Sequence, residues 1–372
     1  MSDTDFLEHA ILDGTKIGFW KDRVEAWERG ERIAPVTMDV AWTRKCQAAC
    51  VFCYATGQAS SDGKAITQKV AFDYLDDAAE LGVKGISLIS DGESTMVPWY
   101  AESIEYASKL GIKIGIGSNG ITLTRPVLER ILPHISYLRF NFSAGEKKRY
   151  AEIMGVKQRV YDIVLQNVRD AMDIVRRDKL NVSVNMQLVC MPQDGDQLLP
   201  FARLAASVRP TYAIIKHCAD SKDGHVGVDY SGYKALYDTF RQCEALSDDD
   251  FKIVVKWNRI ENDGKRNYKN CYGPPFLLQI SGNGLVSTCG FHFNEKYKKF
   301  HMGNIVDTRF RDIFNSDRYW EIVRYLASDQ FDASERCGPN CLQTMTNQWL
   351  YDYKAGKVNF PVGAAPPDLQ FL

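Results

Sequence analysis

The sequence predicts an α/β fold built from repeated strand–helix units around a parallel sheet. Short apolar runs alternate with longer amphipathic ones from about residue 35 to residue 246, which is the pattern of such units. Cysteines and small polar residues directly follow several apolar runs, and functional groups of parallel sheets gather where strands end. Six consecutive units fit a partial six-stranded barrel better than an open doubly wound sheet, although periodicity alone does not decide closure.

The predicted elements follow one another in a regular order. The strand-like segments cover residues 36–42, 85–90, 113–117, 137–142, 181–189 and 212–217. Between them lie helix-like segments at residues 68–81, 99–110, 125–132, 160–178 and 197–208.

The pattern changes after residue 250. A strand-like run at 251–257 precedes a hairpin, because Asn283-Gly284 separates two apolar runs. Two helix-like segments follow, and the Pro/Ala-rich end of the chain is expected to be loosely ordered. The predicted division is an N-terminal lead (1–34), a barrel (35–250), a small α+β domain with a hairpin and helices (251–362), and a tail (363–372).

Composition limits the class of protein. The 372 residues, of which 45% are hydrophobic, suffice for one large domain and a smaller one. The net charge of −1 disfavours nucleic acid or an anionic membrane surface as a partner. Residues 1–8 lack a signal-peptide pattern, and no stretch approaches the roughly twenty apolar residues of a membrane span, so a cytoplasmic protein is expected. In a reducing compartment, clustered cysteines indicate metal thiolates more than disulfides.

Three cysteines follow the first predicted strand. Cys46, Cys50 and Cys53 are separated by three and then two residues, and the next cysteine is Cys190. Three thiolates on one short loop can hold three irons of a 4Fe–4S cube and leave the fourth iron open. Three ligands of a structural zinc site are the alternative.

A second set of four cysteines lies near the predicted hairpin. Cys271 precedes the hairpin, Cys289 follows Gly284 after four residues, and Cys337 and Cys341 form a later pair. Four thiolates can close a cluster that stores or passes an electron. A four-cysteine zinc site is the alternative.

The first cysteine run resembles the signature of the radical S-adenosylmethionine (SAM) superfamily, and the second set resembles the auxiliary-cluster pattern of the SPASM and twitch families. The resemblance implies a partial (β/α)6 TIM-like barrel in which the open iron chelates SAM, and reductive cleavage gives a 5′-deoxyadenosyl radical. It also implies a flavodoxin- or ferredoxin-type electron donor. A full SPASM domain needs about seven cysteines. The four present here predict one auxiliary 4Fe–4S cluster, as in the twitch type.

The resemblance extends to residues that bind SAM. Phe52 matches an aromatic residue that lies against adenine. Gly92-Glu93-Ser94 resembles a Gly-Gly-Glu-Pro segment in which Asp91 replaces the first glycine and Ser94 the proline. Residues near the ribose or carboxylate of SAM are expected at the ends of the third and fourth strands, although each is equally suited to a turn or cap. These are Ser118, Asn119, Asn141 and Ser143.

Late strands carry the predicted substrate residues. Cys218 ends the sixth strand, where a thiol can donate a hydrogen atom to a substrate radical or simply pack in the core. Strand alternation turns about half of the neighbouring polar side chains inward. A Lys or Arg among them could hold a carboxylate or phosphate. The predicted wall consists of Arg139, Gln187 and Lys216, with Asn185 and His217 nearby.

These features predict an enzyme of oxidoreductase or isomerase type. The favoured hypothesis is hydrogen abstraction from a sugar-like or natural-product small molecule, with the auxiliary cluster taking up an electron in dehydrogenation or bond formation. The lead of about 35 residues is shorter than a typical peptide-recognition domain. Alternatives are an epimerase of a sugar or peptide that uses Cys218, a maturase of ribosomally made peptides, and a zinc-binding interaction protein without catalytic activity.

Overall fold

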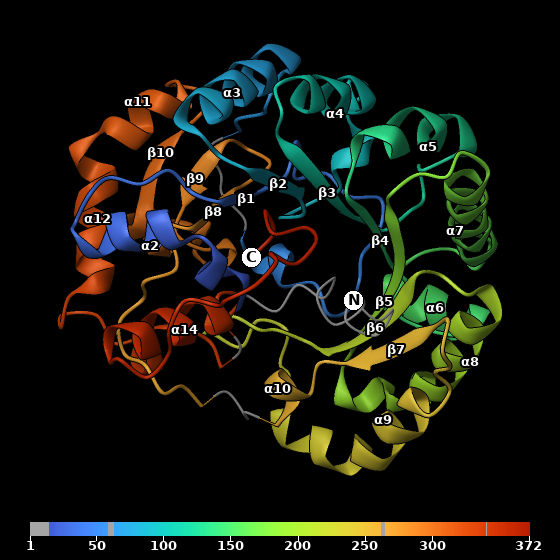
Figure 1. Ribbon diagram of the computed structural model, residues 1–372. Coiled ribbons are helices and arrows are strands. Elements are labelled where there is room, and N and C mark those ends of the chain that lie inside the picture. The colour runs from blue at the N-terminus through green and yellow to red at the C-terminus, as the bar shows by residue number, and fades with distance from the viewer. Residues whose placement is uncertain (1–14, 59–62, 262–264, 340) are drawn as a thin grey trace.

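The computed structural model describes residues 15–58, 63–261, 265–339 and 341–372. Its centre is a curved sheet of parallel strands inside a ring of helices (Figure 1). All six predicted strands are confirmed, and a seventh strand extends the sheet at one edge. In chain order the parallel strands are β1 (Thr37–Val40), β2 (Gly85–Leu88), β3 (Lys113–Ser118), β4 (Tyr137–Asn141), β5 (Ser183–Cys190), β6 (Tyr212–His217) and β7 (Lys252–Val255).

Helices cover the outside of this sheet, which confirms the predicted partial TIM-like barrel (Figure 1). The five predicted helices are α3 (Gln68–Leu81), α4 (Tyr100–Lys109), α5 (Arg125–Ile131), α7 (Arg159–Arg177) and α8 (Leu198–Val208). Thr67 caps α3 through its side chain, and Gly82 ends that helix in the left-handed region. Two further helices surround the barrel, α6 (Lys147–Met154) and α9 (Tyr237–Glu244).

The C-terminal region joins the opposite edge of the sheet. The predicted hairpin is confirmed by the antiparallel strands β8 (Leu277–Ile280) and β9 (Leu285–Ser287). β8 also pairs in parallel with β1, and β10 (His301–Asn304) pairs with β9. β7 lies after the predicted boundary at residue 250 but pairs with β6, and β8 pairs with β1, so one sheet continues across this boundary. The division into two domains at residue 250 stays a prediction. The remaining helices are α2 (Lys21–Glu28), α10 (Trp257–Ile260), α11 (Phe310–Asn315), α12 (Asp317–Ala327), α13 (Ala333–Arg336) and α14 (Thr344–Lys354).

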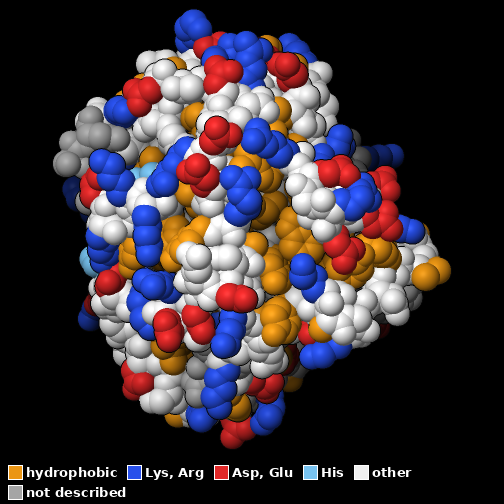
Figure 2. Space-filling model, turned by 90° about the vertical axis from the view of Figure 1, so that its left-hand side faces the viewer, with side chains coloured by type: hydrophobic (Ala, Val, Ile, Leu, Met, Phe, Trp, Pro, Cys, Tyr) orange, Lys and Arg blue, Asp and Glu red, His pale blue; other side chains and the backbone are white. Residues whose placement is uncertain are grey.

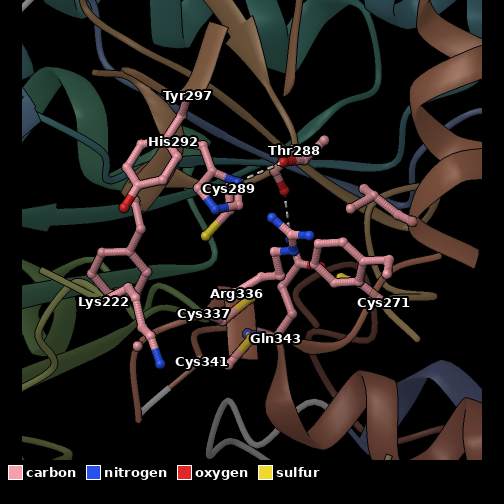
Figure 3. Close-up of a pocket in the computed structure, with 14 residues that line it drawn as sticks. Lys222, Cys271, Thr288, Cys289, His292, Tyr297, Arg336, Cys337, Cys341 and Gln343 are labelled. Carbon is pink, nitrogen blue, oxygen red and sulfur yellow. Dashed lines mark hydrogen bonds between the residues drawn. The ribbon is translucent and has the colours of Figure 1, made fainter. Parts of the chain in front are cut away.

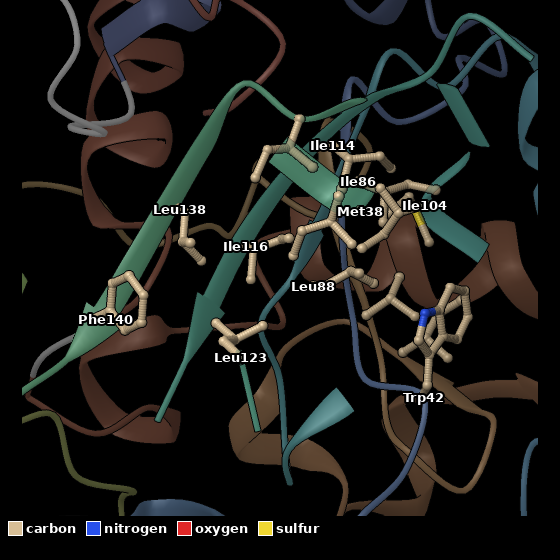
Figure 4. Packing of buried hydrophobic residues seen from close by; sticks show 14 of the residues in the cluster. Met38, Trp42, Ile86, Leu88, Ile104, Ile114, Ile116, Leu123, Leu138 and Phe140 are labelled. Carbon is tan, nitrogen blue, oxygen red and sulfur yellow. The ribbon is translucent and has the colours of Figure 1, made fainter. Parts of the chain in front are cut away.

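Strand alternation separates the core from the lumen of the barrel. Met38, Ile86, Ile114 and Leu138 lie on the helix-facing side of four neighbouring strands and belong to one buried apolar cluster (Figure 4). On each strand the alternate positions face the lumen, because successive side chains of a strand point to opposite faces. The same alternation continues in the neighbouring strands β5, β6 and β8. Many of the lumen-facing side chains are polar, namely Asp39, Ser87, Arg139, Asn141, Asn185, Gln187, Lys216 and Gln279.

The expectation of a loosely ordered tail is wrong. Phe371 is 1% exposed, and its ring centroid lies 5.0 Å from that of Tyr137. Thr37 Oγ1 donates a hydrogen bond to the carbonyl of Gln370 at 2.7 Å, and Trp20 Nε1 donates to that of Leu369 at 3.1 Å. Thr37 and Tyr137 begin their strands, so the tail closes the amino-terminal end of the lumen. Composition missed this because the tail is held largely through its backbone carbonyls.

The surface carries charges of both signs. Figure 2 shows Lys and Arg interspersed with Asp and Glu on the face that includes α2, α11 and α12. In the part of the chain that the structure describes, no helix combines the length and apolarity needed to cross a bilayer.

Replacing Phe371 with alanine should destabilise the fold by about 3 kcal/mol, because the change empties a buried aromatic site against Tyr137. Urea unfolding measures this change. Val362→Ala is the matched control, because Val362 lies nearby in the chain and is fully exposed. Equal stability of the two variants would show that the tail does not contribute to folding.

Candidate active site and auxiliary metal centre

The loop after β1 brings its three cysteines to one cavity. Cys46, Cys50 and Cys53 line a cavity of about 370 Å³. The loop is anchored on the end of α6, because Ala49 N and Val51 N donate to the carbonyls of Met154 and Ile153 at 3.1 and 3.0 Å. Among the described residues that line this cavity, there is no fourth cysteine.

The chemistry of these thiols fits a cationic cluster. Burial raises the pKa of Cys46, Cys50 and Cys53, so thiolates there require positive charge nearby. Ala48 N and Asn119 Nδ2 donate to Cys46 Sγ at 3.5 and 3.6 Å. Within the described ranges, no three His, Cys, Asp or Glu side chains converge on a point that would hold a single metal ion. The sulfurs instead surround a shared cavity.

Glu93 organises the neighbouring loop. Its buried carboxylate accepts hydrogen bonds from Thr95 Oγ1 at 2.9 Å, Ser118 Oγ at 2.9 Å and Asn119 N at 2.8 Å. Burial raises the pKa of Glu93, and these bonds oppose the shift by favouring the charged form. The side chain therefore holds the ends of β2 and β3 together, and the cavity is lined by the same loop.

The predicted SAM residues divide into two groups. Phe52, Gly92, Glu93, Asn119 and Asn141 line the cavity. The other three use their hydroxyls within the protein, and their role in SAM binding stays a prediction. The Oγ atoms of Ser94 and Ser143 accept from Trp42 N and Val189 N at 3.0 and 3.2 Å, and Ser118 Oγ accepts from Gly120 N at 2.9 Å.

Sequence reasoning missed other lining residues. Arg44, Thr56, Ile89 and Met154 also line the cavity. Met154 Sδ lies 3.9 Å from Cys50 Sγ. The proximity of Arg44 and Thr56 to the cysteines was a usable signal. Met154 belongs to α6, which was not predicted, so nothing in the pattern pointed to it.

The second set of cysteines surrounds its own cavity. Four cysteines line it together, from segments before and after the hairpin and from segments after α13 and before α14, namely Cys271, Cys289, Cys337 and Cys341 (Figure 3). Burial raises the pKa of Cys337 to about 12 and that of Cys271 and Cys289 well above its ordinary value. As in the first site, thiolates here require a positive partner.

One backbone amide and one side-chain amide donate hydrogen bonds to sulfurs of this second set of cysteines. Gln343 N donates to Cys341 Sγ at 3.3 Å, and Asn347 Nδ2 donates to Cys271 Sγ at 3.7 Å. Asn347 Oδ1 accepts from Tyr272 N at 2.6 Å, which fixes the orientation of the amide. Hydrogen bonds to cluster sulfurs tune the reduction potential. The sequence did not identify these residues or the other polar lining residues, which include Lys222, His292, Tyr297 and Arg336.

An aromatic pair connects the two sites. Tyr54 directly follows Cys53, and its ring centroid lies 4.6 Å from that of Phe291, two residues after Cys289. The two cysteine groups therefore belong to one continuous structure.

The predicted substrate residues lie on late strands. Arg139, Gln187 and Lys216 occupy lumen-facing positions, and Gln187 Nε2 donates to Asn141 Oδ1 at 2.8 Å. Burial, followed by the charge of Arg139, lowers the pKa of Lys216 to about 7. His217 is one position further on, so it lies on the helix-facing side.

Cys218 is fully buried. Its Sγ lies 3.6 Å from the carbonyl oxygen of Phe52. Burial raises its pKa to about 12, so the thiol is neutral at physiological pH. Its predicted catalytic role stays a prediction.

Comparisons with known proteins agree with this geometry. Residues 40–205 match the family model of the radical SAM superfamily, and residues 271–342 match that of the SPASM iron-sulfur cluster-binding domain. The mycofactocin maturase MftC of Mycolicibacterium smegmatis is 24% identical over 336 residues, which cover 85% of this chain and 78% of that protein. The AdoMet-dependent heme synthase of Methanosarcina barkeri is 29% identical over 94 residues, 25% of this chain and 27% of that protein.

Solved structures share the fold. Streptococcus suis SuiB bound to SAM has a TM-score of 0.61 at 15% identity and covers 82% of this chain and 72% of its own. Native anSMEcpe with bound AdoMet has a TM-score of 0.56 at 12% identity, and the match covers 86% of this chain and 98% of that chain.

The chain carries a radical SAM domain over residues 40–205. A C-terminal SPASM-type domain follows it over residues 271–342. The cofactors of the chain are SAM and two 4Fe–4S clusters. The two groups of cysteines that line the cavities remain the predicted ligands of these clusters.

Anaerobically reconstituted protein should contain about eight irons per chain, because each cysteine group has the donors for one 4Fe–4S cluster. Replacing Cys46, Cys50 and Cys53 together with alanine should leave about four. Cys243→Ala is the control, since this buried cysteine of α9 lines neither cavity. Metal analysis that finds zinc in place of iron would contradict both assignments.

Proposed function

We propose that this protein is a peptide maturase that cleaves SAM reductively and abstracts a hydrogen atom from a residue of its substrate. The observation that carries the proposal is the position of the cavity lined by Cys46, Cys50 and Cys53. Gly117 and Asn141, from lumen-facing positions of β3 and β4, also line it. A radical generated at the cysteine loop would therefore arise next to the polar lumen, at the carboxyl-terminal ends of the strands.

Relatives support a peptide substrate over the small molecule that the sequence favoured. The relative from Mycolicibacterium smegmatis is named a maturase, SuiB has been crystallised with its precursor peptide SuiA, and anSMEcpe with peptides. A small molecule with an anionic group is the second candidate, because Arg139 and Lys216 place positive charge in the lumen and the tail packs against the far ends of β1 and β4.

The residues of the lumen would orient the substrate. When bound, the first cluster and SAM supply a 5′-deoxyadenosyl radical, and the auxiliary cluster supplies an acceptor for one electron. Arg139 and Lys216 supply positive charge for a carboxylate or phosphate of the substrate. Gln187 holds Asn141 in place beside the cavity through their hydrogen bond. Gln187 is buried, whereas Arg139 and Lys216 are half-buried and so remain accessible to a substrate in the lumen.

The epimerase alternative depends on Cys218. Hydrogen-atom donation requires an intact S–H bond, and the raised pKa of this thiol keeps the proton in place. The thiol faces the carbonyl of Phe52, which itself lines the cavity, so a small shift of the cysteine loop would bring it to the substrate. We also propose a cytoplasmic location, where the ten cysteines remain free thiols or metal ligands.

An anaerobic assay with deuterated candidate peptides should place deuterium in 5′-deoxyadenosine, because the radical abstracts the atom directly. Mass spectrometry of the nucleoside reads this out, and deuterated sugar-like molecules form the second arm. Labelled nucleoside from the small molecules alone would contradict the peptide assignment. Cys218→Ala tests the epimerase alternative, because an epimerase would lose net product while still consuming SAM.

The apparent KM for a substrate with an anionic group should rise as pH increases from 6 to 8. Lys216 has a pKa of about 7, so it is protonated below that pH and progressively loses its charge above it. Lys216→Met should raise KM about tenfold at pH 6 and abolish this pH dependence. A retained pH profile in Lys216→Met would assign the titration to another group.

A further inference from the structure

Asp91 stands where the Gly-Gly-Glu-Pro segment of the family has its first glycine, and its carboxylate contacts two other segments of the chain. The side chain is 2% exposed and lies between the end of β2 and the β8–β9 hairpin. Its Oδ2 accepts from Ser281 Oγ at 2.6 Å, and its Oδ1 accepts from Gly282 N at 2.9 Å. Arg44 Nε lies 3.0 Å from Oδ2 as an ion pair.

These contacts join three segments that are distant in the sequence. Arg44 lies two residues before Cys46, Asp91 precedes the Gly92-Glu93 loop, and the turn at Ser281 leads through β9 to Cys289. One buried carboxylate thus bonds the cysteine loop and the SAM-binding loop to the hairpin of the auxiliary site.

The backbones at this junction are too close for side chains. A Cβ on Gly282 would lie 2.1 Å from the carbonyl carbon of Thr43, and a Cβ on Gly92 would lie 2.1 Å from the Thr43 oxygen. Gly92 also has a φ of +98°, which only glycine adopts without strain. Glu93 N adds a hydrogen bond to the carbonyl of Lys45 at 2.9 Å. The junction is therefore tightly packed as well as bonded.

The charge at Asp91 is compensated on every side. A buried carboxylate is costly unless it is bonded or paired, and here a hydroxyl and a backbone amide donate to it and a guanidinium forms an ion pair with it. The hydroxyl and the amide belong to the turn of the hairpin and the guanidinium to the segment before Cys46, so two segments hold the carboxylate. A glycine at position 91 would leave Ser281 and Gly282 without this acceptor.

We propose that Asp91 is a positioning residue that locks the SAM-binding loop to the auxiliary hairpin and so sets the separation of the two cysteine sites. The proposal rests on the two clusters and SAM as cofactors, and it is independent of which substrate the enzyme modifies.

The test compares Asp91→Asn and Ser281→Ala with Asp162→Asn, which removes an exposed carboxylate paired with Lys147. Iron content first establishes that both sites are loaded. Pulsed EPR of the two reduced clusters then gives the distribution of distances between them, and equilibrium titration gives the affinity for SAM. Neither measurement requires a substrate, so failure of the peptide proposal would not affect them.

We expect Asp91→Asn to broaden the distance distribution and weaken SAM binding about tenfold, because a charged acceptor is lost. Ser281→Ala should shift both readouts in the same direction by a smaller factor, and Asp162→Asn should match the unaltered enzyme. If Asp91→Asn fails to load iron, Ser281→Ala decides the question. A lower melting temperature with an unchanged distance distribution and SAM affinity would overturn the proposal, since Asp91 would then be only structural.

Discussion

The alternation of side chains along the parallel strands is the constraint on which the site depends. Apolar residues such as Met38 and Ile86 fill the space beneath the helices, so the fold is stabilised outside the barrel. The opposite faces of the same strands are then free to carry Arg139 and Lys216 without disturbing the core. A polar lumen below the cysteine loop is a direct result of this separation.

The auxiliary site depends on how the hairpin joins the sheet. β8 pairs with the free edge of β1, the strand that leads into the cysteine loop, so one strand supports both sites. Tyr54 and Phe291 meet between the sites. On the outside, buried Asp77 of α3 accepts from Arg309 Nη2 at 2.6 Å, which ties the segment before α11 to the barrel. Backbone pairing, aromatic packing and an ion pair therefore all hold the two sites in one structure.

Sequence patterns predicted the strands, most helices, the hairpin and the cysteine groups, because periodicity and cysteine spacing are local signals. They could not show that the hydroxyls of Ser94 and Ser143 are occupied by backbone amides of distant segments. They also missed the order of the tail, which comes from hydrogen bonds to carbonyls that every sequence has. The contacts of Asp91 were hidden for the same reason, since the hydroxyl that donates to it, that of Ser281, lies 190 residues further along the chain. Elements set by local patterns could therefore be predicted, whereas contacts between segments distant in the sequence could not.

The cluster that we assign to Cys46, Cys50 and Cys53 should have an open iron to which SAM binds. The EPR spectrum of the reduced protein, recorded before and after SAM is added, reports on this iron. We expect SAM to change the signal of one of two clusters and to leave the other unchanged, because only the first site lacks a fourth cysteine among its described lining residues. A spectrum with two cluster signals that SAM does not alter would contradict it.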